Sequence, residues 1–212
     1  MSKLDSTMHI QPIFSSFFCH IKNIDLNHDL ILKDLKKLKY GGTNDAYHHM
    51  SENRNLFNVL KEGKKMKEVF SQYINQAIES LGYNAGHQIV NCWANKVLAK
   101  HDAGFHMHKN FWLSCVYYPH GTLKDEYRLI FKSDRLNDYT GFDIPVNSFN
   151  IFNSHTFTVK VEKGDFIIFP SLLKHKADIH FSKNTRYSIA ANIFPLGTIG
   201  YGEGHLQLNN IL

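Results

Sequence analysis

The sequence predicts a mainly β protein in which two helices pack on the outside of a sandwich or barrel. Three observations carry this prediction: two early helical segments, a run of about eight short β-rich segments after residue 86, and Gly, Asp and Asn clusters between them. There is no internal repeat and no interdomain linker. We therefore expect one domain over 1–212, with an N-terminal strand and supporting helices in 1–86, the core in 87–195 and a C-terminal tail in 196–212.

Each expected element has its own signal. Residues 10–24 are rich in β-branched and aromatic residues, which favours an edge strand. Asn27 can cap a helix that runs to about Tyr40, where a Gly-Gly pair ends it. Over 65–81, apolar residues recur at helical spacing, and we expect that stripe to be core. The expected strands of the second part cover 88–99, 110–119, 127–132, 149–153, 156–161, 165–170, 172–181 and 185–194.

Composition narrows the class of protein and its surroundings. Hydrophobic residues make up 43% of the chain and charged residues 20%, which is typical of a globular protein. The net charge is +5, but the lysines are scattered, and the densest run, Lys61–Lys67, is better explained as a solvated helix face than as a nucleic-acid site. No apolar run approaches bilayer length, so no membrane partner is expected.

Cysteine usage indicates a reducing compartment. The three cysteines are far apart and form no Cys-x-x-Cys pair. Cys92 and Cys115 lie in apolar runs, where buried free thiols are expected. With no leader-like N-terminus, this predicts an intracellular, cytoplasmic protein.

His106 and His108 are the first candidates for a metal site among 14 histidines. Residues i and i+2 of an extended chain point to the same side, so two imidazoles at this spacing can hold one ion. A solvated pair has the same spacing, so the pair needs a third ligand before it indicates a site. By contrast, His48 and His49 lie in a polar stretch where we expect them to be solvated, and Trp93 is expected to be core or pocket wall.

Two further elements follow in the chain. A Gly-Asp turn feeds an apolar strand, and His175 comes after it. Eleven residues later, Arg186 and Ser188 share one face of a predicted strand, which Ala190 and Asn192 continue. An arginine on an inward face is costly unless it meets an anion, and its planar fork suits a carboxylate. Each element alone fits an ordinary surface residue; their combination in this order indicates a site.

The three elements together resemble a known family. The matching stretches are WANKVLAKHDAGFHMHKNFWLSCVYYP, GDFIIFPSLLKH and TRYSIAANIFP. They resemble the 2-oxoglutarate- and Fe(II)-dependent oxygenases, and most closely a subgroup common in marine phages and bacteria. The similarity covers about residues 88–195. It implies a double-stranded β-helix, which is a jelly-roll or cupin-like core, and an oxygenase that uses Fe(II), 2-oxoglutarate and O2.

The resemblance also implies roles for particular residues. His106 and His175 match two iron-binding histidines of the family. Arg186 and Ser188 match the pair that holds the far carboxylate of 2-oxoglutarate. Tyr118 matches a tyrosine that helps to hold that carboxylate in the prolyl-hydroxylase-like branch.

One position departs from the wider superfamily, which uses two histidines and one carboxylate. His108 stands at the carboxylate position, as it does in the closer subgroup, so the expected metal ligands are His106, His108 and His175. A neutral imidazole in place of an anion raises the net charge on the metal by one. This favours binding of dianionic 2-oxoglutarate and makes the ferrous ion harder to oxidise. Asp102 is an alternative source of a carboxylate ligand.

The expected function is hydroxylation, with decarboxylation of 2-oxoglutarate coupled to oxidation of a C–H bond. Two alternatives remain open: a three-histidine dioxygenase of cupin type that does not use 2-oxoglutarate, and a non-catalytic β-helix module that binds a metal or a small acid. The substrate, a small molecule or peptide, and the oligomeric state cannot be read from the sequence. A phage-encoded protein in a host cytoplasm is compatible with the subgroup.

Overall fold

Two antiparallel sheets and two α-helices make up the part of the chain that the computed structural model describes, namely residues 10–12, 15–42, 48–133, 142 and 144–209. The helices are α1 (His28–Leu35) and α2 (Gly63–Ser80), with short 3-10 turns at η1 (Leu56–Asn58), η2 (Leu123–Asp125) and η3 (Gly202–Gly204). The strands are β1 (Cys19–Ile21), β2 (Tyr40–Gly42), β3 (His48–Ser51), β4 (Gly86–Val97), β5 (Leu113–Tyr117), β6 (Arg128–Lys132), β7 (Thr156–Lys160), β8 (Phe166–Pro170), β9 (Lys174–Ala177), β10 (Arg186–Ile199) and β11 (Leu206–Leu208).

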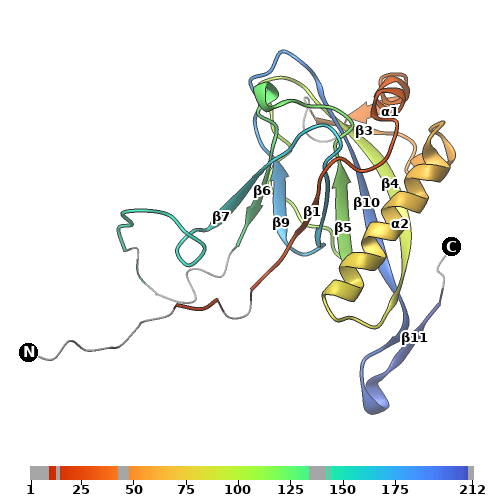
Figure 1. Ribbon diagram of the computed structural model, residues 1–212, viewed down its shortest axis with the longest axis vertical. Helices are drawn as coiled ribbons and strands as arrows, with labels where there is room; N and C mark the ends of the chain where they lie inside the picture. The colour runs from red at the N-terminus through yellow and green to blue at the C-terminus, as the bar shows by residue number, and fades with distance from the viewer. Residues whose placement is uncertain (1–9, 13–14, 43–47, 134–141, 143, 210–212) are drawn as a thin grey trace, which may run out of the picture.

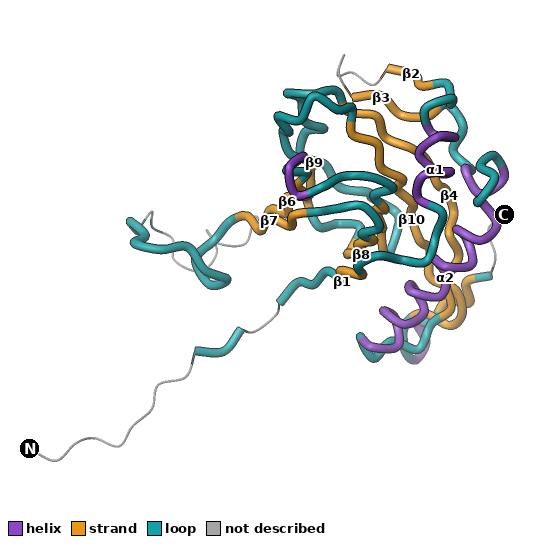
Figure 2. Tube along the Cα trace, turned by 45° about the horizontal axis from the view of Figure 1, so that its top comes forward, coloured by secondary structure: helices purple, strands orange, loops and turns teal. Residues whose placement is uncertain are grey.

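The larger sheet has the order β1-β8-β5-β10-β4-β3-β2, and β11 pairs with the far end of β10. The smaller sheet has the order β7-β6-β9. Helices α1 and α2 lie on one side of the larger sheet and the smaller sheet lies on the other (Figures 1 and 2). Neighbours in the sheet that are far apart in sequence, such as β8 beside β5 and β10 beside β4, give the jelly-roll arrangement of a double-stranded β-helix. The predicted fold class is confirmed.

Two apolar clusters correspond to the two sides of the larger sheet. The cluster on the helix side contains Phe70 and Ile74 of α2 together with Ile189 of β10, all fully buried. The ring of Phe70 stacks on that of Phe166 with the centroids 4.4 Å apart. The second cluster lies between the sheets, and its buried members are Val116, Tyr118, Tyr127, Leu129, Phe131, Val159, Val161, Ile167 and Phe169.

Local sequence explains where the helices begin. Asn27 caps α1, since its side-chain oxygen accepts a hydrogen bond from the backbone N–H of Leu30 at 3.1 Å. Helix α2 begins at Gly63, where a Cβ atom would lie only 2.1 Å from the carbonyl oxygen of Phe57. Glycine is therefore required at this crossing of η1 and α2. The sequence-based prediction of the second helix is confirmed.

The first helix is shorter than expected. It ends at Leu35, and Tyr40 begins strand β2 instead of ending the helix. The Tyr40 hydroxyl donates to the carbonyl of Leu35 at 3.0 Å, and its ring packs against Tyr187 of the larger sheet. This tertiary contact favours a strand at Tyr40. The spacing of apolar residues in the sequence does not reveal such a contact.

Three other expectations about strands differ from the structure. Residues 149–153 form a turn because the side chains of Asn150 and Asn153 accept backbone N–H bonds from within it. The segment expected as a strand over 172–181 is paired only from Lys174 to Ala177. Strand β10 continues beyond 194 to Ile199 and returns as β11, so part of the expected tail is a hairpin.

The expectation of a solvated loop at His48 and His49 is wrong. Both residues belong to strand β3, which pairs with β4, and both are half-buried. The Nε2 atom of His48 lies 3.1 Å from Oδ1 of Asn95. No helix among the described residues combines the length and apolarity needed to cross a bilayer.

Candidate active site

Two main-chain contacts bring the His-x-His segment to His175. His106 forms an isolated antiparallel bridge with His175, in which each backbone N–H donates to the other residue's carbonyl, at 3.0 and 2.9 Å. The backbone N–H of His108 donates to Ser171 at 2.8 Å. The segment therefore runs along the free edge of β9, and residues more than 60 positions apart in sequence become neighbours.

The three histidines form a group that can hold one metal ion. One ligand atom from each of His106, His108 and His175 lies within 4.8 Å of the others. Their ring centroids are 4.4, 5.1 and 5.2 Å apart. Among the described residues, this is the sole cluster of three or more His, Cys, Asp or Glu side chains with this geometry. Facially placed imidazoles suit a first-row divalent metal.

In each histidine one ring nitrogen is already occupied by the protein. Nδ1 of His106 lies 3.0 Å from the carbonyl oxygen of Gly104, and Nδ1 of His175 lies 2.8 Å from that of Leu173. Nδ1 of His108 contacts side chains instead, Oδ1 of Asn192 at 2.6 Å and Oγ of Ser114 at 3.1 Å. Since the two carbonyl oxygens and the amide oxygen of Asn192 only accept, the Nδ1 of each neutral ring carries the proton and its Nε2 keeps the lone pair for a metal.

Burial keeps the histidines in the form that binds metals. It lowers the pKa of His175 to about 3, with a further contribution from the nearby His106 ring. Burial also lowers the pKa of His108. Both imidazoles are therefore neutral near pH 7, as metal ligation requires.

Asp102 does not join the histidine group. Its carboxylate forms an ion pair with Lys176, with Nζ and Oδ2 2.8 Å apart, and this hydrogen bond lowers the pKa of Asp102. The alternative ligand considered from the sequence therefore has another partner in the structure.

Arg186 is buried, with 1% of its surface exposed. Its Nη1 donates to the carbonyl oxygen of Asp178 at 2.8 Å, and its guanidinium lies over the ring of Tyr127, 5.7 Å from the centroid. Its Nη2 is buried and has no hydrogen-bond partner. A buried cation with an unused donor fits an anionic ligand, because leaving such a donor unpaired is costly.

Ser188 and Tyr118 are also buried, at 7% and 1% exposure. Ser188 shares the Arg186 face of β10, and Tyr118 is close enough to Arg186 for the guanidinium charge to lower the pKa of its hydroxyl, against the larger effect of burial. Burial raises the pKa of the Tyr118 hydroxyl to about 12, so this hydroxyl is protonated and can donate a hydrogen bond. The donor set around Arg186 suits a carboxylate.

The structure adds polar residues that sequence reasoning missed. Oδ1 of Asn95 accepts from Nε1 of Trp93 and contacts Nε2 of His48, both at 3.1 Å. The ring of Trp93 lies 5.6 Å from that of His108, and Asn95 is the cross-strand partner of Ser188. The signal available was the alternation of the Trp-Ala-Asn stretch, which places Trp93 and Asn95 on one face.

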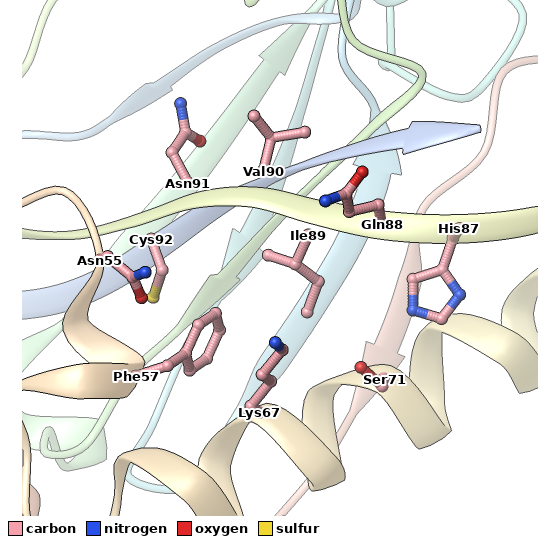
Figure 3. Close-up of a pocket in the computed structure, with 10 residues that line it drawn as sticks. All are labelled: Asn55, Phe57, Lys67, Ser71, His87, Gln88, Ile89, Val90, Asn91 and Cys92. Carbon is pink, nitrogen blue, oxygen red and sulfur yellow. The ribbon is translucent and has the colours of Figure 1, made fainter. Parts of the chain in front are cut away.

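A separate cavity of about 400 Å³ lies between α2 and the first half of β4 (Figure 3). It contains none of the predicted site residues. Its lining residues are Asn55, Phe57, Lys67, Ser71, His87, Gln88, Ile89, Val90, Asn91 and Cys92. Because Ile89 and Cys92 belong to the helix-side cluster, this cavity lies mainly on the side of the larger sheet away from the histidines.

Comparison with known proteins agrees with this geometry. The profile of a family described as "Putative 2OG-Fe(II) oxygenase" matches residues 91–192, a span that contains every predicted site residue. Over this span, the resemblance to the 2-oxoglutarate- and Fe(II)-dependent oxygenases that the sequence predicted is confirmed. Fe(II), 2-oxoglutarate and O2, the cofactors predicted from the sequence, are those of the superfamily. No curated protein matches the chain.

Solved structures of other oxygenases share the fold. HygX from Streptomyces hygroscopicus, with nickel, 2-oxoglutarate and hygromycin B bound, has a TM-score of 0.60 at 9% identity, over 85% of this chain and 83% of HygX. A prolyl-4-hydroxylase from Pseudomonas putida has a TM-score of 0.57 at 10% identity, over 85% and 93%. SnoN, an epimerase from nogalamycin biosynthesis, has 0.61 at 10%, over 84% and 76%. At these identities the likeness concerns the fold, and the named reactions differ from one another.

Proposed function

We propose that this oxygenase is a hydroxylase that couples decarboxylation of 2-oxoglutarate to oxidation of a C–H bond in a small molecule or peptide. Fe(II), when bound, would activate O2 for this oxidation with 2-oxoglutarate as the source of two electrons. The neighbours include an enzyme crystallised with hygromycin B and a prolyl-4-hydroxylase, which supports both substrate classes. The free cysteines are consistent with a reducing, cytoplasmic setting.

His106, His108 and His175 are the proposed metal ligands. Their Nδ1 atoms are engaged by protein oxygens, which orients each ring so that its Nε2 is left for the metal. When a metal is bound, these three ligands would leave room for the cosubstrate and O2 beside it. No carboxylate of the described residues would then reduce its positive charge.

Arg186, Ser188 and Tyr118 are the proposed clamp for the far carboxylate of 2-oxoglutarate. The single observation that carries the proposal is the buried Nη2 of Arg186, which has no hydrogen-bond partner. Arg186 lies on the same face of β10 as Asn192, the residue that contacts His108. Between Ser188 and Asn192 that face carries only the methyl group of Ala190. A three-histidine dioxygenase without 2-oxoglutarate would have no use for this cation.

The test is anaerobic reconstitution with Fe(II), followed by exposure to O2 and measurement of succinate from 2-oxoglutarate. We expect wild type to produce succinate and Arg186→Ala to lose at least about 30-fold in 2-oxoglutarate affinity, because removing a buried charge partner costs 2 kcal/mol or more. Arg54→Ala, which removes an exposed arginine outside the site, is the matched control.

The alternatives predict different results. A dioxygenase that does not use 2-oxoglutarate would consume O2 without forming succinate, and Arg186→Ala would leave its rate unchanged. A non-catalytic module would bind metal and 2-oxoglutarate, measured by calorimetry, without consuming O2. Either result would overturn the proposed function.

A further inference from the structure

Asn192 lies at the centre of a buried hydrogen-bond network beside the proposed metal ligand His108. Its Oδ1 is 2.6 Å from Nδ1 of His108 and accepts from Oγ of Ser114 at 2.8 Å. Oγ of Ser114 also lies 2.8 Å from Oγ of Ser171. The side chains of this network come from three different segments, since Ser114 belongs to β5, Asn192 to β10, and Ser171 follows β8.

The directions of these hydrogen bonds are determined by Asn192. An amide oxygen only accepts, so His108 and Ser114 must both donate to it. Ser114 has one hydroxyl proton and uses it on Asn192, so it must accept from Ser171. Oγ of Ser114 also lies 3.1 Å from Nδ1 of His108, and because its one proton goes to Asn192 it can only accept there. The proton of His108 therefore resides on Nδ1.

Water cannot easily replace Asn192 in this role. Asn192 is 4% exposed, and Ser114 and Ser171 are fully buried. His106 and His175 differ in this respect, because their Nδ1 atoms contact backbone carbonyls that remain when a side chain is replaced. Only His108, of the three histidines, depends on a side-chain amide for its orientation.

We propose that Asn192 is a positioning residue that holds His108 as the Nδ1–H tautomer and aims its Nε2 at the metal. The inference rests on the metal-binding role of His108 in the proposed function. It gives a physical reason for asparagine here: a histidine ligand must donate its second N–H, whereas a carboxylate ligand has none to donate.

The first test measures binding of Co(II), without O2 or 2-oxoglutarate, by its visible absorption. We expect Asn192→Leu to weaken Co(II) binding about 10- to 100-fold, the usual effect of losing such a partner. Asn192→Asp keeps an oxygen acceptor for Nδ1 and should retain tight binding. Asn91→Leu is the matched control, since Asn91 is the cross-strand neighbour of Asn192 and has no hydrogen bond to a histidine.

A double-mutant cycle separates positioning from general stability. In a His108→Ala background, Asn192→Leu should cause no further loss of Co(II) affinity, because Asn192 acts through His108. Circular dichroism and melting of the metal-free proteins identify any variant that fails to fold, and Asn192→Asp then carries the comparison. Equal losses in both backgrounds, or wild-type affinity in Asn192→Leu, would overturn the inference.

The outcome for Asn192 can be distinguished from that for the proposed function. Co(II) binding by wild type together with absence of succinate formation would contradict the oxygenase reaction alone, and the cycle would still decide the role of Asn192. Absence of Co(II) binding by wild type would overturn both.

Discussion

The two faces of β10 carry different kinds of side chain. The face toward the helices carries Tyr187, Ile189, Ala191 and Ile193, all buried in the helix-side apolar cluster. The opposite face carries Arg186, Ser188, Ala190 and Asn192, also buried. Both faces exclude water, but one is filled by apolar packing, and the other carries polar side chains, including the unpaired Nη2 of Arg186. The comparison shows that alternate buried residues of one strand can serve different ends, those on one face stability and those on the other face chemistry.

The largest expected effect is on metal binding, when His106 is replaced. His106→Ala should greatly weaken metal binding at the three-histidine group and reduce 2-oxoglutarate turnover to background. Because His106 is exposed, the free energy of unfolding of the metal-free protein should change by less than about 0.5 kcal/mol. Metal content after anaerobic loading and urea unfolding measure the two quantities. His155→Ala, which replaces an exposed histidine outside the group, should alter neither.

The opposite result is expected on the helix side, at Phe70. Phe70→Ala removes a fully buried ring that stacks on Phe166, and should lower the free energy of unfolding by about 3–5 kcal/mol. Metal affinity of the folded fraction should remain that of wild type. A large loss of metal affinity at temperatures where the variant is fully folded would show that the two faces are coupled.

An intermediate effect is expected on acidification, at His120. Its Nε2 accepts the backbone N–H of Tyr187 at 2.9 Å, and burial lowers its pKa to about 4. Between about pH 6.5 and pH 4 the unfolded chain therefore binds a proton that the folded chain does not, and stability falls as pH falls, by up to about 1.4 kcal/mol per pH unit.

His120→Gln keeps an acceptor for Tyr187 but does not titrate, so urea unfolding from pH 7 to pH 4.5 should show a shallower fall than in wild type. Parallel curves for the two proteins would contradict this explanation. His175, whose pKa is also lowered, contributes in the same direction in both proteins and therefore cancels in the comparison.

The smallest effect is expected at Asp102. Asp102→Asn removes a carboxylate that is paired with Lys176 outside the histidine group, so Co(II) affinity should be unchanged. A loss comparable to that of His106→Ala would instead identify Asp102 as a ligand, and would return the site to two histidines and one carboxylate.

The sequence predicts which histidines lie together better than it predicts the packing around them. His106 and His108 were recognisable by their spacing, and Arg186 by its place on an inward strand face. Their approach to His175 depends on pairing between distant strands, which local periodicity cannot reveal and which the family resemblance implied. The roles of these residues stay predictions that the experiments above test.

What the sequence did not predict are contacts made across strands. Asn192 was visible only as a continuation of the Arg186 face, and its bond to His108 requires knowing which strands are neighbours. The same holds for His48, which contacts Asn95 from an adjacent strand. The predicted helix end at Tyr40 was too late, because Tyr40 packs on Tyr187 in a tertiary contact that the local sequence does not show. Pairing energies of this kind override local propensity.

The unpaired guanidinium nitrogen of Arg186 has a practical consequence for handling the protein. A buried cation that awaits a partner does not distinguish strongly between diacids of similar length, so succinate should compete with the cosubstrate from which it forms. Phosphate, citrate or sulfate in a buffer should compete as well. Preparations exchanged into weakly coordinating salts are therefore the right starting point for any measurement of affinity.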